Sequence, residues 1–499
     1  MESSLLIWAA LLTPLAGALL VLLARSPRAA LRLSSAAGLA SSVLAAALGL
    51  SGFGAVPPSA ASGWLRVDAL SAAHLLLLAL VGGTSSAFAL VYFGDEIDRG
   101  RLTPRQARVF GPLWCGAFFA LTLLLVSNNL GIMWVGMEAT TLLTAFLIAL
   151  HVSRESLEAM WKYVLICSVG VAFAFMGTLL TAAAAPRAGA PEALFWTGLL
   201  AGASRLDPNL MRAAFVFLLV GYGTKVGLAP MHNWLPDAHS QAPAPVSALF
   251  SGFMLNSALY CILRYLPVAD RATGGGGWPR DLLLGFGLLS LGVGAVFVLF
   301  QRDAKRLLAY CSVEHLGLVA IGVGLGGLGT VAALVHSLNH SLAKSLAFWS
   351  VGRLGQASGS HDVARMSGAF RSSTVWGVGL LASFVALTGA APFATFLSEL
   401  AVLRAAFQGG RTIVFSVVLA LLALAFVGLL RHAIRLAWGP SEVEPRRLDD
   451  RLLDRALVAV TLIALLGLGF GWPQPLMHAA ESAARIVNGE AALVAGVLR

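Results

Sequence analysis

Residues 221–245 read GYGTKVGLAPMHNWLPDAHSQAPAP, and this stretch decides the fold class. Lys225 stands there among small and apolar residues, and several prolines interrupt the same apolar run: Pro230, Pro236, Pro243 and Pro245. Proline and glycine leave backbone groups without helical partners, which is tolerated at membrane depth only where protein or a water-filled cavity satisfies them. The stretch therefore predicts a broken transmembrane helix beside an ion path.

The composition around this stretch is that of a membrane protein. Of the 499 residues, 58% are hydrophobic and only 12% are charged, whereas soluble domains carry about 25% charged residues. A spanning helix needs about 20 mostly apolar residues. We therefore expect an all-α integral membrane protein with about fourteen transmembrane helices. The predicted spans are Leu5–Leu23, Ser34–Leu50, Ala69–Phe93, Val109–Val126, Leu130–Leu150, Met160–Ala182, Ala213–Leu228, Val246–Tyr265, Leu282–Phe300, Leu307–Leu325, Val331–Val351, Thr374–Leu403, Thr412–Trp438 and Ala456–Trp472.

A second broken run, ALTGAAPFATFLSELAVL at residues 386–403, carries Gly389 and Pro392. The two breaks fall in predicted helices 7 and 12, which suggests two five-helix repeats. An odd number of helices inverts the second repeat relative to the first. The predicted divisions are 1–108 for helices 1–3, 109–266 for the first repeat (helices 4–8), 282–438 for the second (helices 9–13), and 456–499 for the last helix and tail. The tail after Pro475 reads either as an amphipathic surface helix or as a weak span.

The net charge of +10 is a topology signal. Basic residues gather in alternate connections, such as residues 25–32, 99–108 and 446–455, and such connections face the cytoplasm. Both termini are therefore expected outside it, with the chain in the cell's inner (plasma) membrane. Residues 5–23 lack a basic segment before them, so we interpret them as a retained helix and not as a signal peptide.

No redox cofactor is expected in this chain. The cysteines all fall in apolar runs and are not clustered: Cys115, Cys167, Cys261 and Cys311. A disulfide framework or an iron–sulfur site would need clustering, so these thiols are interpreted as small buried side chains. A Rossmann fingerprint and a Walker loop are also missing from the sequence.

Ionisable residues inside the apolar runs need a reason, because a charge at mid-bilayer costs at least about 2.5 kcal/mol. Each of them also has a structural explanation, as a hydrogen-bonded carboxyl or a residue anchored at the membrane surface. We interpret the set instead as a proton pathway. Its members are Glu138, Lys225, His232, Asp237, His239, Glu314, His315, His336, His340, Lys344 and Glu399.

Spacing favours a relay in HSLNHSLAKSL, residues 336–346. His336, His340 and Lys344 are four residues apart and therefore share one helical face. Imidazoles suit proton transfer because their pKa lies near physiological pH. A zinc site is the alternative here and at His232 with His239. However, a zincin motif needs Glu after the first His, where Ser337 stands, and so no metal is expected.

At these residues the chain resembles the antiporter-like subunits shared by respiratory complex I, Mrp-type sodium/proton antiporters and group 4 membrane-bound hydrogenases. The segments that carry the resemblance are KVGLAPMHNWLPDAHSQAPAPVSA, KRLLAYCSVEHLG and HSLNHSLAKSL. Within this group, three segments most resemble the F subunit of hydrogenase-4: WVGMEATTLLTAFLIAL, SLEAMWKYVLICSVGVAF and NSALYCILRY.

The resemblance implies a fourteen-helix fold with inverted five-helix repeats. It implies that Glu138 and Lys225 are a coupled pair, that His336, His340 and Lys344 form a central relay, and that Glu399 gates the second half-channel. The sequence departs from the family at Asn256, where several members carry a second Lys, and at Glu399, where some members carry Lys. The link from Lys225 to the central relay would then use water, His232 or His239.

The function implied is a non-redox, proton-translocating subunit of a hydrogenase-4-like or complex I-like oxidoreductase complex. Its partners would be other membrane and peripheral subunits, with protons, or Na⁺, as the transported ion and lipid around it. Nucleic acid is not expected as a partner. Two alternatives stay open: an Mrp-type cation/proton antiporter subunit, and an ion-driven membrane subunit for inorganic carbon uptake that works with a soluble zinc protein.

Overall fold

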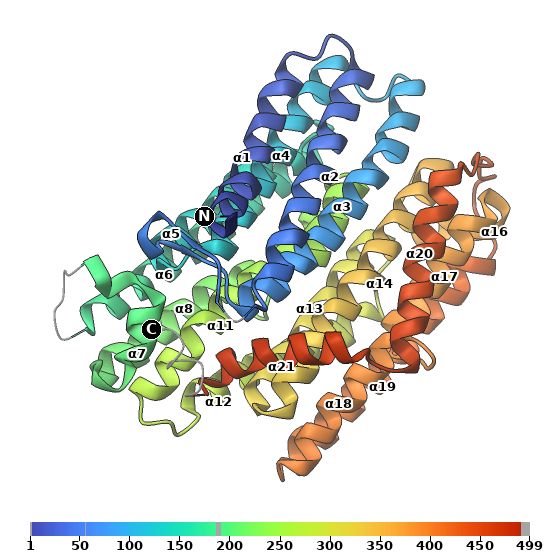
Figure 1. The fold of residues 1–499 in the computed structure, drawn as a ribbon. Coiled ribbons are helices and arrows are strands. Elements are labelled where there is room, and N and C mark those ends of the chain that lie inside the picture. Colours follow the sequence, from blue (N-terminus) through green and yellow to red (C-terminus); the bar gives the residue numbers. More distant parts are fainter. Residues whose placement is uncertain (1, 55, 186–190, 491–499) are drawn as a thin grey trace.

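The structure, a computed structural model, describes residues 2–54, 56–185 and 191–490. It confirms the predicted all-α membrane fold, since long helices form almost all of it (Figure 1). The described residues also contain one short hairpin beside α1 (Glu2–Leu22). Its strands, β1 (Ser59–Ala60) and β2 (Leu65–Arg66), are antiparallel and were not predicted.

The first half of the chain contains the first broken helix and ends with α11. The helices before the break are α1 (Glu2–Leu22), α2 (Pro27–Ser51), α3 (Ala69–Asp98), α4 (Pro104–Val126), α5 (Leu130–Ile148), α6 (Arg154–Ala183), α7 (Trp196–Ala201) and α8 (Pro208–Val226). After it come α9 (Trp234–Gln241), α10 (Ala244–Leu249) and α11 (Leu255–Ala272). A π-helical turn, Phe250–Met254, joins α10 to α11, and such turns are frequent at functional sites.

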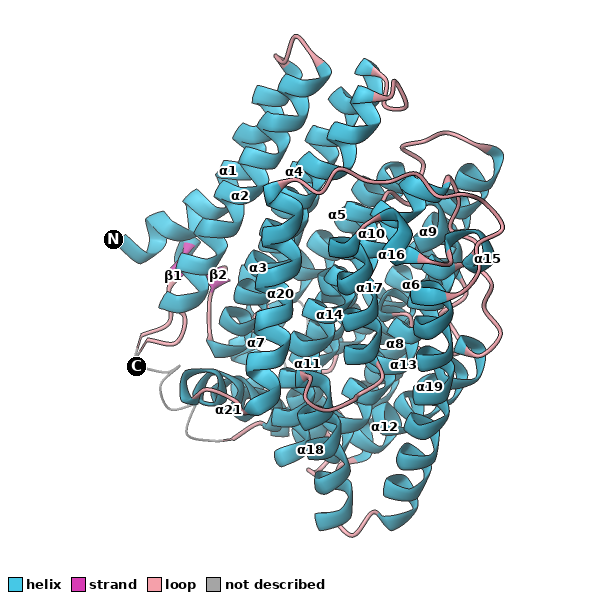
Figure 2. Cartoon of the chain, turned by 90° about the vertical axis from the view of Figure 1, so that its right-hand side faces the viewer, coloured by secondary structure: helices cyan, strands magenta, loops and turns pink. Residues whose placement is uncertain are grey.

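The second half contains the long central helix α14 and the second broken helix, α17 with α18. Its helices are α12 (Trp278–Val298), α13 (Ala304–Leu325), α14 (Leu328–Ser358), α15 (Val363–Met366), α16 (Ala369–Ser372), α17 (Thr374–Leu387), α18 (Ala394–Gln408), α19 (Thr412–Trp438), α20 (Leu452–Phe470) and α21 (Gln474–Asn488). Figure 2 shows α14 within the bundle and the loops gathered at the helix ends.

Eleven helices among the described residues are long and apolar enough to cross a membrane. Each of the fourteen predicted spans coincides with a helix or a broken helix, although the length and composition of α8, α14 and α17–α18 do not meet the same standard. The exact number of membrane crossings therefore stays a prediction.

The two breaks have the same local form. Gly-Leu-Ala-Pro at residues 227–230 and Gly-Ala-Ala-Pro at residues 389–392 each contain a cis Ala–Pro peptide bond. The leading glycines have φ of 81° and 68°, a region that glycine enters at no steric cost. The inverted repeats remain a prediction.

Ion pairs join three connections rich in basic residues on one side of the bundle: Arg28 and Arg451 pair with Asp98, and Arg446 pairs with Asp95. We name this side the basic face. Capping side chains start the helices there. Thr103 and Gln106 form a capping box on α4, Ser153 caps α6, and Asp303 accepts from the first amides of α13. Such caps satisfy amides that have no partner within the helix. The basic face is thus built of well-fixed helix ends.

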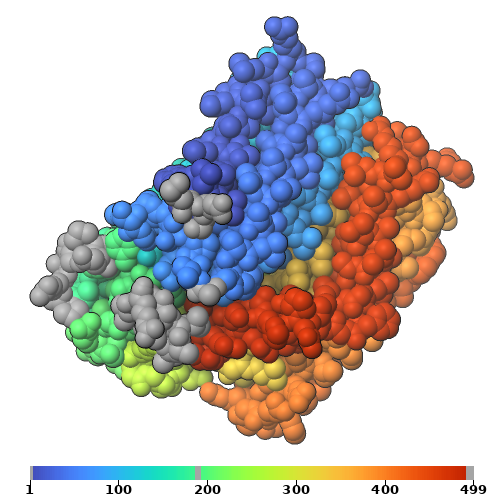
Figure 3. All heavy atoms as spheres, in the orientation of Figure 1, coloured from blue at the N-terminus to red at the C-terminus, as the bar shows by residue number. Residues whose placement is uncertain are grey.

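Up to residue 490, where the described residues end, the tail forms α21, a surface helix of 15 residues. It lies across the ends of the other helices (Figure 1) and crosses the surface beside α3 (Figure 3). Arg280 donates to the carbonyl of Val487 over 2.9 Å, and Arg271 donates to that of Gly489. Cations at a helix C-terminus satisfy its last carbonyls, so these contacts fix α21 on the side opposite the basic face.

Candidate ion pathway

The first group of predicted residues surrounds Lys225, the penultimate residue of α8. Lys225 is wholly buried. Its Nζ donates to Tyr163 Oη over 2.5 Å and to Thr141 Oγ1 over 2.9 Å, and it lies 4.5 Å from the centre of the Tyr163 ring. The amine thus has neutral oxygen partners from α5 and α6. Thr144 also lies 2.7 Å from Tyr163 Oη and extends the polar cluster.

Glu138 lies on α5 one turn from Thr141. Its Oε1 accepts a hydrogen bond from Ser168 of α6 over 2.8 Å, and its Oε2 is buried without a partner. Among the described residues no ion pair joins Glu138 to Lys225. The two residues of the predicted pair therefore make no direct contact in this structure, and each binds other polar side chains.

The first break places its two histidines differently. His232 is buried beside Tyr310, with ring centres 6.0 Å apart. His239, on α9, is wholly buried and stacks on Phe348 of α14 at 4.9 Å, and neither of its ring nitrogens has a hydrogen-bond partner. A buried polar group without a partner is costly. The part of His239 in the predicted pathway stays a prediction.

Asp237 lies apart from this buried group. It accepts from Lys162 over 3.1 Å and from Arg306 over 2.5 Å at the basic face, and its side chain is about one-fifth exposed. The structure thus gives Asp237 an ion-pair partner on each side. Its predicted part in the pathway stays a prediction.

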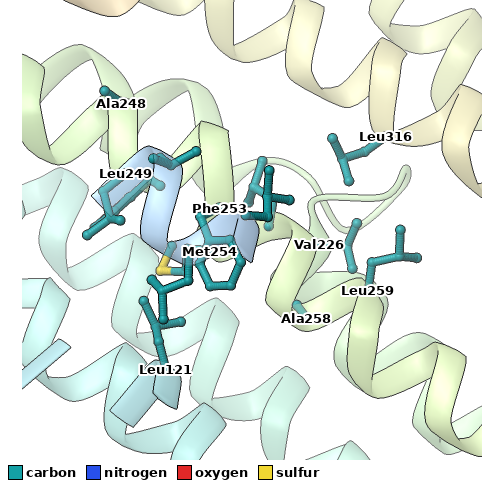
Figure 4. Packing of buried hydrophobic residues seen from close by; sticks show 14 of the residues in the cluster. Leu121, Val226, Ala248, Leu249, Phe253, Met254, Ala258, Leu259 and Leu316 are labelled. Carbon is teal, nitrogen blue, oxygen red and sulfur yellow. The ribbon is translucent and has the colours of Figure 1, made fainter. Parts of the chain in front are cut away.

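Between the two halves lies Asn256, the residue at the place where the resemblance predicts a second lysine in several members. Asn256 Nδ2 lies 3.3 Å from Ser341 Oγ on α14, and Ser251 lies 2.8 Å from Ser312 on α13. Buried apolar side chains pack in the same region, and Figure 4 shows Phe253, Val226 and Leu316 among them. A short polar contact, from Asn256 to Ser341, therefore joins α11 to α14 within an apolar core.

His336, His340 and Lys344 lie along α14, beside His315 of α13. His315 Nδ1 lies 2.9 Å from His336 Nε2, and His336 Nδ1 lies 2.9 Å from Ser398 Oγ. His340 has two unpartnered ring nitrogens, with its ring 5.2 Å from that of His315. Lys344 Nζ donates to the carbonyl of Leu308 over 2.6 Å. All four ionisable side chains are buried.

Two carboxylates complete the second half. Glu314 Oε2 is buried without a hydrogen bond, 3.8 Å from His315 Nε2. Glu399 follows Ser398 on α18 and is also buried. The possible ligand atoms of His315, His336 and Glu399 lie within 4.8 Å of one another, as do those of Cys311, Glu314 and His315. Histidine and carboxylate are ligands that zinc accepts, so the geometry keeps the metal alternative open to experiment.

One buried ion pair, between Arg264 and Asp68, was not predicted from the sequence. Arg264 of α11 donates to both oxygens of Asp68 over 2.6 and 2.7 Å, and to Ser71 and Tyr260 over 2.6 and 2.8 Å. Both residues stand at the ends of predicted spans, where charges are ordinary. Their pairing across almost two hundred residues could not be read from local sequence.

Comparison with known proteins gives the family. The family described as "NADH:quinone oxidoreductase/Mrp antiporter, TM" matches residues 127–425. The chain is 41% identical over 347 residues to the "Hydrogenase-4 component F homolog" of Methylacidiphilum infernorum (isolate V4), which covers 68% of this chain and 72% of that relative. The predicted resemblance to the F subunit of hydrogenase-4 is thus confirmed.

Two solved structures share the fold. A chain of the membrane-bound sulfane sulfur reductase, an archaeal respiratory membrane complex, matches with a TM-score of 0.88, 22% identity and 99% coverage of both chains. A chain of the Mrp complex from Dietzia sp. DQ12-45-1b matches with a TM-score of 0.84, 20% identity and full coverage of both. Both of these chains belong to membrane complexes. The chain belongs to the NADH:quinone oxidoreductase/Mrp antiporter transmembrane family and is a multi-pass, antiporter-like membrane subunit.

Proposed function

We propose that this chain carries protons across the plasma membrane as a subunit of a redox-driven complex of the hydrogenase-4 or complex I type. The observation that carries the proposal is the series of buried ionisable groups between the two helix breaks. It begins at Lys225 beside the first break, continues along α14, and ends at Glu399 beside the second. Ionisable side chains are rare inside membrane segments and mark ion pathways and proton relays.

The hydrogen bonds of the second half support transfer of protons. His315, His336 and Ser398 form an unbroken chain with links of 2.9 Å. A neutral imidazole holds one proton and accepts another at its second nitrogen, so it passes a proton without moving. Lys344 lies two turns along α14 from His336 and adds a group that can store a charge.

The first half would hold the charge that drives the second. Lys225 has neutral partners in Tyr163 and Thr141. Glu138 lies one turn from Thr141 on α5, and its Oε2 has no hydrogen-bond partner. Movement of Lys225 from Tyr163 toward Glu138 would pair two opposite charges and change the electrostatic potential at the next groups. This movement is the proposed coupling step, and redox chemistry belongs to partner subunits in this scheme.

Isolation of the complex tests the assignment. The chain would carry a small affinity tag and be purified in mild detergent, and its partners would be identified by mass spectrometry. Subunits with iron–sulfur or nickel signals in electron paramagnetic resonance support assignment to a redox-driven complex. Small antiporter subunits without redox centres would replace it by the Mrp-type alternative. A zinc-containing soluble partner would replace it by the carbon-uptake alternative.

Transport is measured on the same preparation. The complex would be reconstituted into liposomes that contain a pH-sensitive dye, and a K⁺ diffusion potential set with valinomycin would drive proton flux. Proton flux above that of empty liposomes is expected, with loss of the flux in Lys225→Ala. Equal flux in the wild type and in Lys225→Ala would overturn the proposal.

A further inference from the structure

A buried carboxylate at the basic face is joined to an accessible histidine. Glu96, near the end of α3, has a side chain only 8% exposed, and its Oε2 lies 3.0 Å from His151 Nε2. The His151 side chain is 35% exposed in the connection between α5 and α6. Gln356 of α14 gives Glu96 a weaker contact of 3.5 Å. Imidazole thus connects a buried acid to water.

A buried lysine stands next along the same face. Lys305, in the first turn of α13, is 2% exposed and donates to the carbonyl of Ala242 over 2.7 Å. Among the described residues it has no carboxylate at ion-pair distance, but it interacts electrostatically with Glu96 and with Asp303. A lysine buried with only a carbonyl partner is expensive to keep for packing alone.

His361 also interacts electrostatically with Lys305, but it adds no second positive charge beside the lysine. Burial lowers the pKa of His361 well below its usual range, so this imidazole is neutral at working pH. Asp303 is engaged as the cap of α13, where it accepts from the amides of Lys305 and Arg306 over 2.9 Å. Of the two acids near Lys305 in the described part of the chain, Asp303 and Glu96, only Glu96 contacts a side chain that is accessible to water, that of His151.

His239 continues the series toward the central relay. Its ring nitrogens are unpartnered, and it lies within electrostatic range of both Lys305 and Lys344. Ala242, whose carbonyl binds Lys305, follows His239 at the end of α9, and Ser247 donates to the carbonyl of His239 over 3.2 Å. The end of α9 thus joins the basic face to α14.

We propose that His151 and Glu96 form a proton inlet from the basic face, which continues through Lys305 and His239 to Lys344. In each step one proton leaves an N–H or O–H group for the lone pair of the next group, with no other bond broken. His151 takes a proton from water at Nδ1 and passes the one on Nε2 to Glu96. Lys305, when neutral, accepts it and passes it to His239. The inlet rests on the proposed proton transport and adds its entry point.

The liposome assay tests the inlet with two variants and one matched control. His151→Gln and Glu96→Gln each remove one link, and both are expected to slow the flux about tenfold or more, as for loss of a positioned proton carrier. Asp98→Asn is the control. Asp98 lies on the same end of α3 and pairs with Arg28, on the surface and outside the series. Its flux is expected to equal that of the wild type.

Chemical rescue separates proton entry from structure. Millimolar imidazole in the medium can replace the accessible His151 and is expected to restore the flux of His151→Gln. It cannot replace the buried Glu96 and is expected to leave Glu96→Gln slow. Normal flux in both variants, or a slow His151→Gln that imidazole does not restore, overturns the inlet. These results are distinct from failure of the proposed transport, in which the wild type itself conducts no more than Lys225→Ala.

Discussion

Lys225 Nζ lies 2.5 Å from Tyr163 Oη, and Glu138 binds Ser168 instead of the lysine. The buried amine therefore rests on a phenol and a threonine, while its expected acidic partner binds a serine and keeps one oxygen, Oε2, without a hydrogen bond. A charge held by neutral oxygens can move to a carboxylate when the potential around it changes. Because Glu138 and Lys225 are separate in this structure, the partners that hold Lys225 can be tested by substitution.

Lys225→Ala is expected to abolish proton flux, because no neighbour of the same chemistry can take its place. Tyr163→Phe removes one of the two oxygen acceptors and leaves Thr141. A hydrogen bond to a charged group is worth about 1.5–3 kcal/mol, so the loss is expected to slow the flux at least about tenfold. Dye-loaded liposomes measure both variants. Equal flux in Tyr163→Phe and the wild type would show that the phenol is packing only.

Arg264→Leu is expected to destabilise the protein, since it leaves Asp68 buried and unpaired. Breaking a buried ion pair from one side costs about 3–5 kcal/mol. The thermal unfolding temperature in detergent, followed by intrinsic fluorescence, should fall clearly. Arg411→Leu is a matched control, because its pair with Asp281 is more than half exposed. Similar unfolding temperatures for the two variants would contradict a structural role for Arg264.

Both termini are expected outside the cytoplasm. Residue 2 begins α1, which ends at the basic face, and Arg271 binds Gly489 on the opposite side. If the basic face is cytoplasmic, both ends lie across the membrane from it. Alkaline phosphatase fused at either end should be active and a green fluorescent reporter dark. A reporter inserted in residues 439–451 should give the reverse, and a fluorescent C-terminal fusion would contradict the orientation.

The sequence predicts best what a single residue shows by itself. Lys225 and Glu138 stand out because a charge in an apolar run is costly. Pro230 and Pro392 each follow a glycine closely, and together the two residue types predict the breaks because both weaken a helix. The helix spacing of HSLNHSLAKSL predicts that His336, His340 and Lys344 share a face, and the structure places them along α14. These predictions need no knowledge of distant parts of the chain.

Partners brought together by folding could not be predicted in this way. Tyr163 and Thr141 are ordinary residues of apolar helices, and only packing of α5, α6 and α8 places them on Lys225. Asp237 looked like a member of the buried series, but Lys162 and Arg306 come to it at the basic face. The β1–β2 hairpin has two-residue strands, too short for an alternating pattern to be visible.

The last prediction concerns the central residues His336, His340 and Lys344, which we expect to carry protons and not a resident metal. His315, His336 and Glu399 lie close enough for an ion, so the two readings must be separated by experiment. A relay predicts that His336→Gln and His340→Gln slow the flux only partly, because water can replace one link. Lys344→Ala should reduce it more, since a neutral substitute stores no charge. Flux in liposomes measures all three.

Metal binding predicts a different pattern for the same variants. Zinc held by His315, His336 and Glu399 would be present in stoichiometric amount in the purified wild type and lost in His336→Gln. It would be retained in Lys344→Ala, because lysine is not among the ligands. His340 lies outside this group of ligands, so His340→Gln should retain zinc under the metal reading and still slow the flux under the relay reading. Elemental analysis beside the flux measurements decides between them: stoichiometric zinc that only His336→Gln releases would refute the relay, as would normal flux in Lys344→Ala.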